Sequence, residues 1–189
     1  MSAWIETFSG KKFHLLEPQP DEICIEDIAH ALSNQCRYTG HTRRFYSVAE
    51  HSVHVSLLAV HYQLDGLLHD ASEAYICDLA RPVKMLTPVG KPYYEIEDRI
   101  MRVIAEKFGF TWPPPKEVKE ADNIMLLSEK DQLMTNLSWD SDASSAEARS
   151  TYPHGSGILD YAETPLIGYL PKVVERIFME RFDEITKGQ

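Results

Sequence analysis

Apolar residues recur at helical spacing along most of this 189-residue chain. This pattern is the strongest constraint that the sequence places on the fold. Residues 92–108 show it clearly, since an inward stripe is followed by Gly109, a residue suited to the left-handed end of a helix. Similar stripes predict further helices over residues 25–34, 47–61, 65–76, 116–136 and from 171 onward. No segment shows the alternation of a half-buried strand. The predicted fold class is therefore all-α, with one helical domain over residues 1–189.

Two segments are predicted to lie outside the helices. Residues 1–20 are expected to form an extended lead-in, because Gly10, Pro18 and Pro20 interrupt them. Residues 138–157 are rich in Ser, Asp and Gly, a composition typical of a flexible surface loop.

Charge and composition restrict the partners of this chain. The formal net charge of −10 argues against binding to nucleic acid or to an anionic membrane. A small anionic substrate is still compatible with it, because a few Arg and Lys residues can reverse the field inside one cleft. The three cysteines form no C-x-x-C pair, which favours a reducing compartment. The N-terminal residues lack a signal-peptide pattern and no apolar run is long enough to span a bilayer, so we expect a cytoplasmic protein.

A capping box is predicted at the start of the second helix. In it the Ser47 hydroxyl and the Glu50 carboxylate would both bind open backbone amides. The helix that follows is apolar on most of its circumference, which is typical of a buried helix.

The segment 67–74 combines an apolar helical pattern with three ionisable residues, His69, Asp70 and Glu73. On a continuous helix these three side chains share one face, since they lie three or four positions apart. Burying a carboxylate beside an imidazole is costly unless something neutralises its charge. A divalent cation does so, and imidazole with carboxylate oxygen suits several transition metals.

Two further ligands are sought on other helices. His51 lies early in the buried second helix, and Asp122 borders the apolar stripe of helix 116–136, where Asp is a poor helix former. Taken alone, a histidine such as His51 is more often a hydrogen-bonded core residue than a metal ligand. His54 lies close to the same face, so it is either a partner of a ligand or an alternative ligand.

The order of these residues resembles the H…HD…D signature of the HD-domain phosphohydrolases. The similarity is closer to the branch of bacterial 5′-deoxynucleotidases and phage dATP triphosphohydrolases. It covers roughly residues 5–135 and rests on four pieces of sequence: 37–38, 45–52, 69–84 and 120–122. It implies an HD-domain helical bundle with a metal site between helices, acting on small-molecule deoxynucleotides as a homo-oligomer.

The resemblance also implies a role for each matching residue. One divalent ion (Mn, Co, Ni, Zn or Mg) would be held by His51, His69, Asp70 and Asp122. Glu73 would orient or deprotonate the attacking water. The substrate-binding residues would be Arg37 and Lys84 at phosphate, Tyr38 at the nucleoside and Asp78 at the sugar 3′-hydroxyl, with Arg37 also pairing with Glu73.

Each of these residues also has a structural interpretation that sequence alone leaves open. Glu73 fits a solvated helix position, Arg37 a helix end, and Tyr38 core packing. Lys84 and Asp78 fit a solvated turn.

The substrate likewise stays open between deoxynucleoside monophosphates and triphosphates, dATP among them. Adenine-specific phage members are expected to carry a bulky residue after the aromatic one. Here Thr39 and Gly40 follow Tyr38, which argues against strict adenine specificity. Hydrolysis of a cyclic nucleotide or an alarmone, or nucleotide binding without turnover, are the alternative functions.

Overall fold

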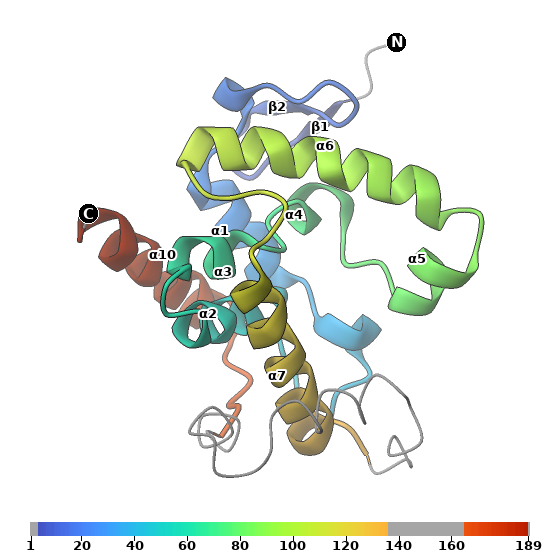
Figure 1. The fold of residues 1–189 in the computed structure, drawn as a ribbon, viewed down its shortest axis with the longest axis vertical. Helices are drawn as coiled ribbons and strands as arrows, with labels where there is room; N and C mark the ends of the chain where they lie inside the picture. Colours follow the sequence, from blue (N-terminus) through green and yellow to red (C-terminus); the bar gives the residue numbers. More distant parts are fainter. Residues whose placement is uncertain (1–3, 136–164, 189) are drawn as a thin grey trace.

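The computed structural model describes residues 4–135 and 165–188, and it is mostly helical (Figure 1). The predicted loop over residues 138–157 lies outside this described part. None of the described helices combines the length and the apolarity that crossing a membrane requires.

The N-terminal segment corrects the prediction that the fold is all-α. Strands β1 (Trp4–Glu6) and β2 (Lys12–His14) pair antiparallel, with Ile5 opposite Phe13. Three-residue strands are too short for apolar–polar alternation to be recognised in a sequence. The Phe13 ring is buried and stacks on Tyr75 with ring centroids 3.8 Å apart, which attaches this small sheet to the helical core. The 3-10 turn η1 (Pro20–Glu22) then leads into the first helix.

The core is built around α1 (Ile25–Asn34), α2 (Val48–Leu58) and α10 (Pro171–Lys187). The predicted bounds of α1 are confirmed, and Ile28 and Leu32 on its apolar stripe are fully buried. α10 packs along α1 and α2 and contributes the buried Phe178. Each such side chain stabilises the fold by about 1.5–3 kcal/mol through burial alone.

The start of α2 has one half of the predicted capping box. Ser47 Oγ accepts a hydrogen bond from the Glu50 amide at 3.1 Å, as expected. The Glu50 carboxylate does not return to the Ser47 backbone, and instead accepts hydrogen bonds from the Gly168 and Tyr169 amides at 3.0 and 2.9 Å. The capping box therefore gives way to a tertiary contact with the segment before α10. α2 ends at Leu58, earlier than the predicted residue 61.

The predicted helix over residues 65–76 is wrong, because the chain forms two short helices there. α3 (Gln63–Leu68) and α4 (Glu73–Ile76) are separated by turns. The amides of Ala71 and Glu73 bind carbonyls three residues earlier, at Leu68 and Asp70, so the α-helical hydrogen-bond pattern is interrupted. This break lies at the His-Asp pair itself.

Three further helices of the described residues lie between α4 and α10 in the chain. α6 (Gly90–Phe108) ends at Gly109 in the left-handed conformation (φ 74°), as predicted. α7 (Lys116–Leu133) stops a turn before the predicted residue 136. The short α5 (Arg81–Leu86) was not predicted; it lies beside α6, on the opposite side of the view from α10 (Figure 1).

Candidate metal centre and its cleft

Three side chains converge at the break between α3 and α4. His51 Nε2 lies 3.2 Å from His69 Nε2 and 3.8 Å from Asp70 Oδ2, and His69 Nε2 lies 3.2 Å from the same Asp70 oxygen. The ligand atoms of these three residues all lie within 4.8 Å of one another, so the group could hold a metal ion. His51 is fully buried and comes from α2, while His69 and Asp70 come from the turn.

The hydrogen bonds on the outer ring nitrogens show that this donor set fits a cation. His69 Nδ1 lies 2.8 Å from the Gly66 carbonyl oxygen, which only accepts, so Nδ1 carries the proton. His51 Nδ1 is likewise a donor, to Glu129 Oε1 at 2.6 Å. In neutral rings both Nε2 atoms therefore present lone pairs to each other and to a carboxylate. A carboxylate or carbonyl behind each ligating imidazole is the usual arrangement around protein metals.

Asp122 brings a fourth candidate donor atom, a carboxylate oxygen, next to this group. On α7, its Oδ1 lies 3.1 Å from His51 Nε2. Its side chain is less buried than those of His51 and His69, and it lines the cleft described below. The sequence-derived ligand candidates thus come from α2, the turn after α3, and α7.

The electrostatics of the group follow from its crowding. Burial raises the pKa of the Asp70 carboxyl, but His69, His51 and Arg37 outweigh it and hold that pKa well below its usual range. Burial and the Arg37 charge lower the pKa of His51, but Glu129 and Asp122 raise it by more, so that the resulting pKa is about 9. In the metal-free protein a proton on His51 thus takes the place of a cation between the carboxylates.

Glu129 is a site residue that sequence reasoning missed. It is completely buried on α7 and accepts hydrogen bonds from His51, from Arg37 Nε at 3.1 Å and from the Tyr38 hydroxyl at 2.8 Å. Burial raises the pKa of its carboxyl, but Arg37 and His51 lower it to about 2. The available signal was its spacing of seven residues from Asp122, which places both carboxylates on one helix face.

Arg37 and Glu73 do not form the pair that the sequence resemblance suggested. Arg37 contacts Glu129 and Asp70, the latter at 3.6 Å. Glu73 Oε1 lies 3.5 Å from Lys84 Nζ, and Lys84 also contacts Glu97 at 3.1 Å. Lys84 is therefore a largely buried residue of α5 rather than part of a solvated turn.

The environment of Glu73 is unusual for a carboxylate. Its side chain is almost fully buried, and Oε2 has no hydrogen-bond partner in the described part of the chain. Burial, with the charges of Asp70 and Asp78, raises the pKa of Glu73 well above its ordinary value, against the opposing effect of Lys84. A carboxylate whose proton affinity is raised in this way suits proton transfer.

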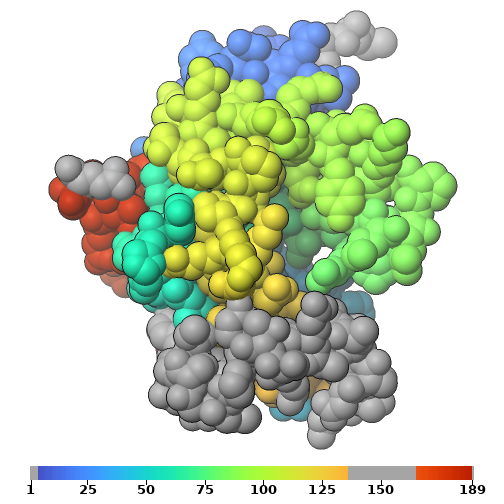
Figure 2. Space-filling view, in the orientation of Figure 1, coloured from blue at the N-terminus to red at the C-terminus, as the bar shows by residue number. Residues whose placement is uncertain are grey.

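These groups line one cleft of about 820 Å³. Arg81 and Lys84 of α5 form one side of it and Lys119 and Asp122 of α7 another, and the surface is hollowed between these helices in Figure 2. The sequence-predicted residues on its walls are Arg37, Tyr38, His69, Asp70, Glu73, Asp78, Lys84 and Asp122. His51 and Glu129 lie behind this wall.

Backbone strain is concentrated beside the same cleft. The positive-φ residues other than glycine, in the part of the chain that is described, are Tyr38, Thr39 and Cys77, with φ of 53°, 54° and 70°. Tyr38 and Thr39 lie in η2 (Arg37–Gly40), and Cys77 precedes Asp78. Such strain costs about 1–3 kcal/mol per residue and gathers at functional sites.

Two features lie outside the cluster. Burial and the neighbouring His51 lower the pKa of His54 to about 4, and His54 is not in the group that could hold a metal.

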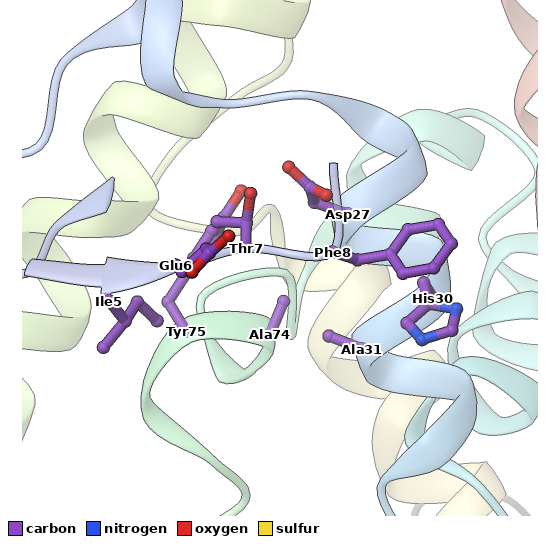
Figure 3. Close-up of a pocket in the computed structure, with 9 residues that line it drawn as sticks. All are labelled: Ile5, Glu6, Thr7, Phe8, Asp27, His30, Ala31, Ala74 and Tyr75. Carbon is purple, nitrogen blue, oxygen red and sulfur yellow. The ribbon is translucent and has the colours of Figure 1, made fainter. Parts of the chain in front are cut away.

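A second cavity of about 450 Å³ shares no lining residue with the cleft. It lies between the N-terminal segment, α1 and α4, where the Phe8 ring stacks on His30 with centroids 3.7 Å apart (Figure 3).

Fold and site together define a mostly helical protein with a candidate metal centre in a cleft that contains several charged side chains. No protein-family profile matches the chain. It is 37% identical over 186 residues to the uncharacterized protein YfdR of Escherichia coli K12, covering 98% of this chain and 97% of that protein. It is also 37% identical over 145 residues to the uncharacterized protein RCAP_rcc00048 of Rhodobacter capsulatus, covering 69% and 73% of the two chains. The chain therefore belongs to the same family as these two proteins.

Proposed function

We propose that this protein is a metal-dependent phosphohydrolase that removes the 5′-phosphate or the triphosphate from 2′-deoxynucleotides. The observation that carries the proposal is the meeting of His51, His69, Asp70 and Asp122 at a cleft that also contains Arg37, Lys84 and Glu73. The HD-domain resemblance of the same residues supports it and supplies the substrate class.

The metal would be held by the two Nε2 atoms and by the carboxylates of Asp70 and Asp122. Mixed nitrogen and oxygen ligands suit Mn, Co, Ni or Zn, whereas Mg prefers oxygen alone. When bound, such a cation supplies Lewis-acid activation of water and of a phosphoryl oxygen.

Glu73 has the properties of the general base. Its Oε2 is buried and has no hydrogen-bond partner in the described residues, and Glu73 lies three residues after the candidate ligand Asp70. It would take the proton of the attacking water as the new phosphorus–oxygen bond forms. The bond from phosphorus to the 5′-oxygen then breaks, and the proton passes to that leaving oxygen or to solvent. The products are a deoxynucleoside and phosphate or triphosphate.

Arg37 and Lys84 would bind the phosphate oxygens. Arg37 has its Nε on Glu129, which leaves the other guanidinium nitrogens, one of them 3.6 Å from Asp70, on the cleft side. Lys84 supplies a positive charge between Glu73 and Glu97. The Asp78 amide donates a hydrogen bond to Gln35 Oε1 at 3.2 Å. The Asp78 carboxylate would accept a hydrogen bond from the sugar hydroxyl, and Tyr38 would pack on the nucleoside.

A product-release assay on Glu73→Gln tests the proposal. The wild-type protein is offered deoxynucleoside mono- and triphosphates, matching ribonucleotides, a cyclic nucleotide and an alarmone, each with Mn, Co, Mg or no metal. We expect metal-dependent release from the deoxynucleotides, and a loss of about 10²–10⁴-fold in kcat for the variant with metal still bound. Glu106→Gln, on the exposed side of α6, is the control and keeps full turnover.

Two results would contradict the proposal. Full turnover by Glu73→Gln would remove the assigned base. Wild-type protein that binds metal and nucleotide but releases no product would instead indicate a binding module without turnover.

A further inference from the structure

Glu129 connects two parts of the site that are separate in sequence. Its Oε1 accepts the Nδ1 proton of His51 at 2.6 Å. Its Oε2 accepts from Arg37 Nε at 3.1 Å and from the Tyr38 hydroxyl at 2.8 Å. Glu129 is completely buried and does not line the cleft, so any effect it has on a bound ligand passes through neighbouring side chains such as these three.

We infer that Glu129 is a positioning residue that couples the metal centre to the Arg37–Tyr38 segment. One carboxylate holds the ring of a candidate metal ligand, the Arg37 side chain that would bind phosphate and the Tyr38 side chain that would pack on the nucleoside. Occupancy of the metal site and binding of a phosphate therefore favour each other, and by linkage the coupling is reciprocal. The metal half of this inference rests on geometry alone, and the phosphate half rests on the proposed function.

The Arg37–Tyr38 segment needs such an anchor. The backbone of Tyr38 and Thr39 is held at positive φ in η2, a conformation that persists only where surrounding contacts impose it. The Arg37 amide bonds the Tyr46 carbonyl at 2.9 Å, which fixes the start of the segment. Glu129 fixes both side chains from the other side.

The position of Glu129 on α7 strengthens the connection. Asp122, the fourth candidate ligand, lies on the same helix face, two turns before it. A small movement of α7 would therefore shift a ligand oxygen and the anchor of Arg37 together. Metal binding to Asp122 would hold this helix in the position that also holds Arg37.

A purely structural role is the competing explanation, because a buried ion pair is destabilising to break whatever its function. The two explanations differ in what happens to the folded protein. A structural carboxylate changes the fraction of folded molecules, whereas a positioning carboxylate changes the affinity and the ligand field of the metal in molecules that are folded.

Titration of the metal-free protein with Co²⁺ separates these cases, since the visible absorption of Co²⁺ reports ligand geometry. We expect Glu129→Gln to bind Co²⁺ about 10–100-fold more weakly than wild type, with an altered spectrum. The matched control is Asp27→Asn, which neutralises another buried carboxylate, bonded to Ser9 and outside the cleft lining. It should match wild type in both measurements. Equal Co²⁺ affinity and spectrum for Glu129→Gln and wild type would overturn the positioning role.

The phosphate half is tested with inorganic phosphate, in wild type and in Glu129→Gln, with and without Co²⁺. In wild type we expect Co²⁺ to increase phosphate affinity, and in the variant we expect a smaller increase. Wild-type protein that binds Co²⁺ but no phosphate would overturn the coupling together with the proposed function, while the Co²⁺ comparison would still decide the positioning role.

Tyr38→Phe provides the same test if Glu129→Gln does not fold. It removes one hydrogen bond from Glu129 Oε2 and touches no candidate ligand. We expect its Co²⁺ affinity to fall at least about twofold, the lower end of what one hydrogen bond contributes. Co²⁺ affinity identical to wild type would overturn the inference.

Discussion

His51 is the group through which this metal centre responds to pH. Burial and the positive charge of Arg37 lower the pKa of His51, but Glu129 and Asp122 raise it overall to about 9. Because the pKa is raised, the ring of the metal-free protein is protonated below about pH 9, with Nε2 3.1 Å from Asp122 Oδ1. A metal ion that uses Nε2 must therefore displace this proton.

The size of the effect follows from that pKa. Between pH 9 and pH 7 the proton competes over two pH units, so the apparent metal affinity at pH 7 should be about 100-fold below its limiting value. This factor corresponds to about 2.7 kcal/mol, at 1.36 kcal/mol for each unit. Affinity should rise about tenfold for each unit between pH 7 and pH 8.5, with release of about one proton per metal bound.

Calorimetric titration with Co²⁺ measures both quantities. Pairs of buffers with different ionisation enthalpies give the number of protons released, and a pH series gives the slope. His54→Gln is the matched control: His54 is on the same helix, and burial and the His51 charge lower its pKa to about 4, so it carries no proton to release at pH 7. A pH-independent affinity with no proton release would refute the reasoning, because His51 would then not exchange its proton for the metal.

Two further substitutions test the packing and the charge of the site. Gly66→Ala would place a Cβ 3.0 Å from the Ser56 Cα and 3.1 Å from the Val55 carbonyl oxygen. We therefore expect the substitution to lower the free energy of unfolding of the metal-free protein, measured in urea, by about 1–3 kcal/mol. Unchanged stability would mean that α2 and α3 can move apart at no cost. Lys84→Met should raise the KM for a deoxynucleotide about 10–100-fold, the value of one charge-assisted hydrogen bond, while Lys91→Met on α6, outside the cleft lining, should leave it unchanged. A KM for Lys84→Met equal to wild type would exclude Lys84 as a phosphate contact.

The long helices could be predicted because their signals are local. A stripe of apolar residues and a terminal residue such as Gly109 depend only on neighbours along the chain, and the structure confirms helices α1, α6 and α10. The break between α3 and α4 could not be predicted in this way. There the sequence keeps a helical pattern, but the amides of Ala71 and Glu73 bond carbonyls three residues back, and the resulting turn places His69 against His51 of another helix.

Long-range contacts limit how much of the site can be predicted from the sequence. The adjacent His69 and Asp70 could be recognised from one segment, but the partner of Arg37 lies 92 positions away, at Glu129. Nothing in the spacing of charged residues specifies which buried carboxylate an arginine will meet. The sequence resemblance implied Glu73 as the partner of Arg37, whereas in the structure Arg37 contacts Glu129 and Glu73 contacts Lys84. The roles assigned to these residues in catalysis stay predictions.

The charge balance of the cleft accounts for the expected link between metal and substrate. The walls carry five carboxyl groups and four cationic side chains, and Glu129 lies behind them, so the site with every carboxyl group ionised has two negative charges in excess. Arg37 and Lys84 are already paired with these carboxylates, so a phosphate entering alone would meet few free positive charges. The proton on His51 offsets only one unit of the excess. A divalent cation offsets both, which is why a phosphate should bind well only after the metal has replaced the proton.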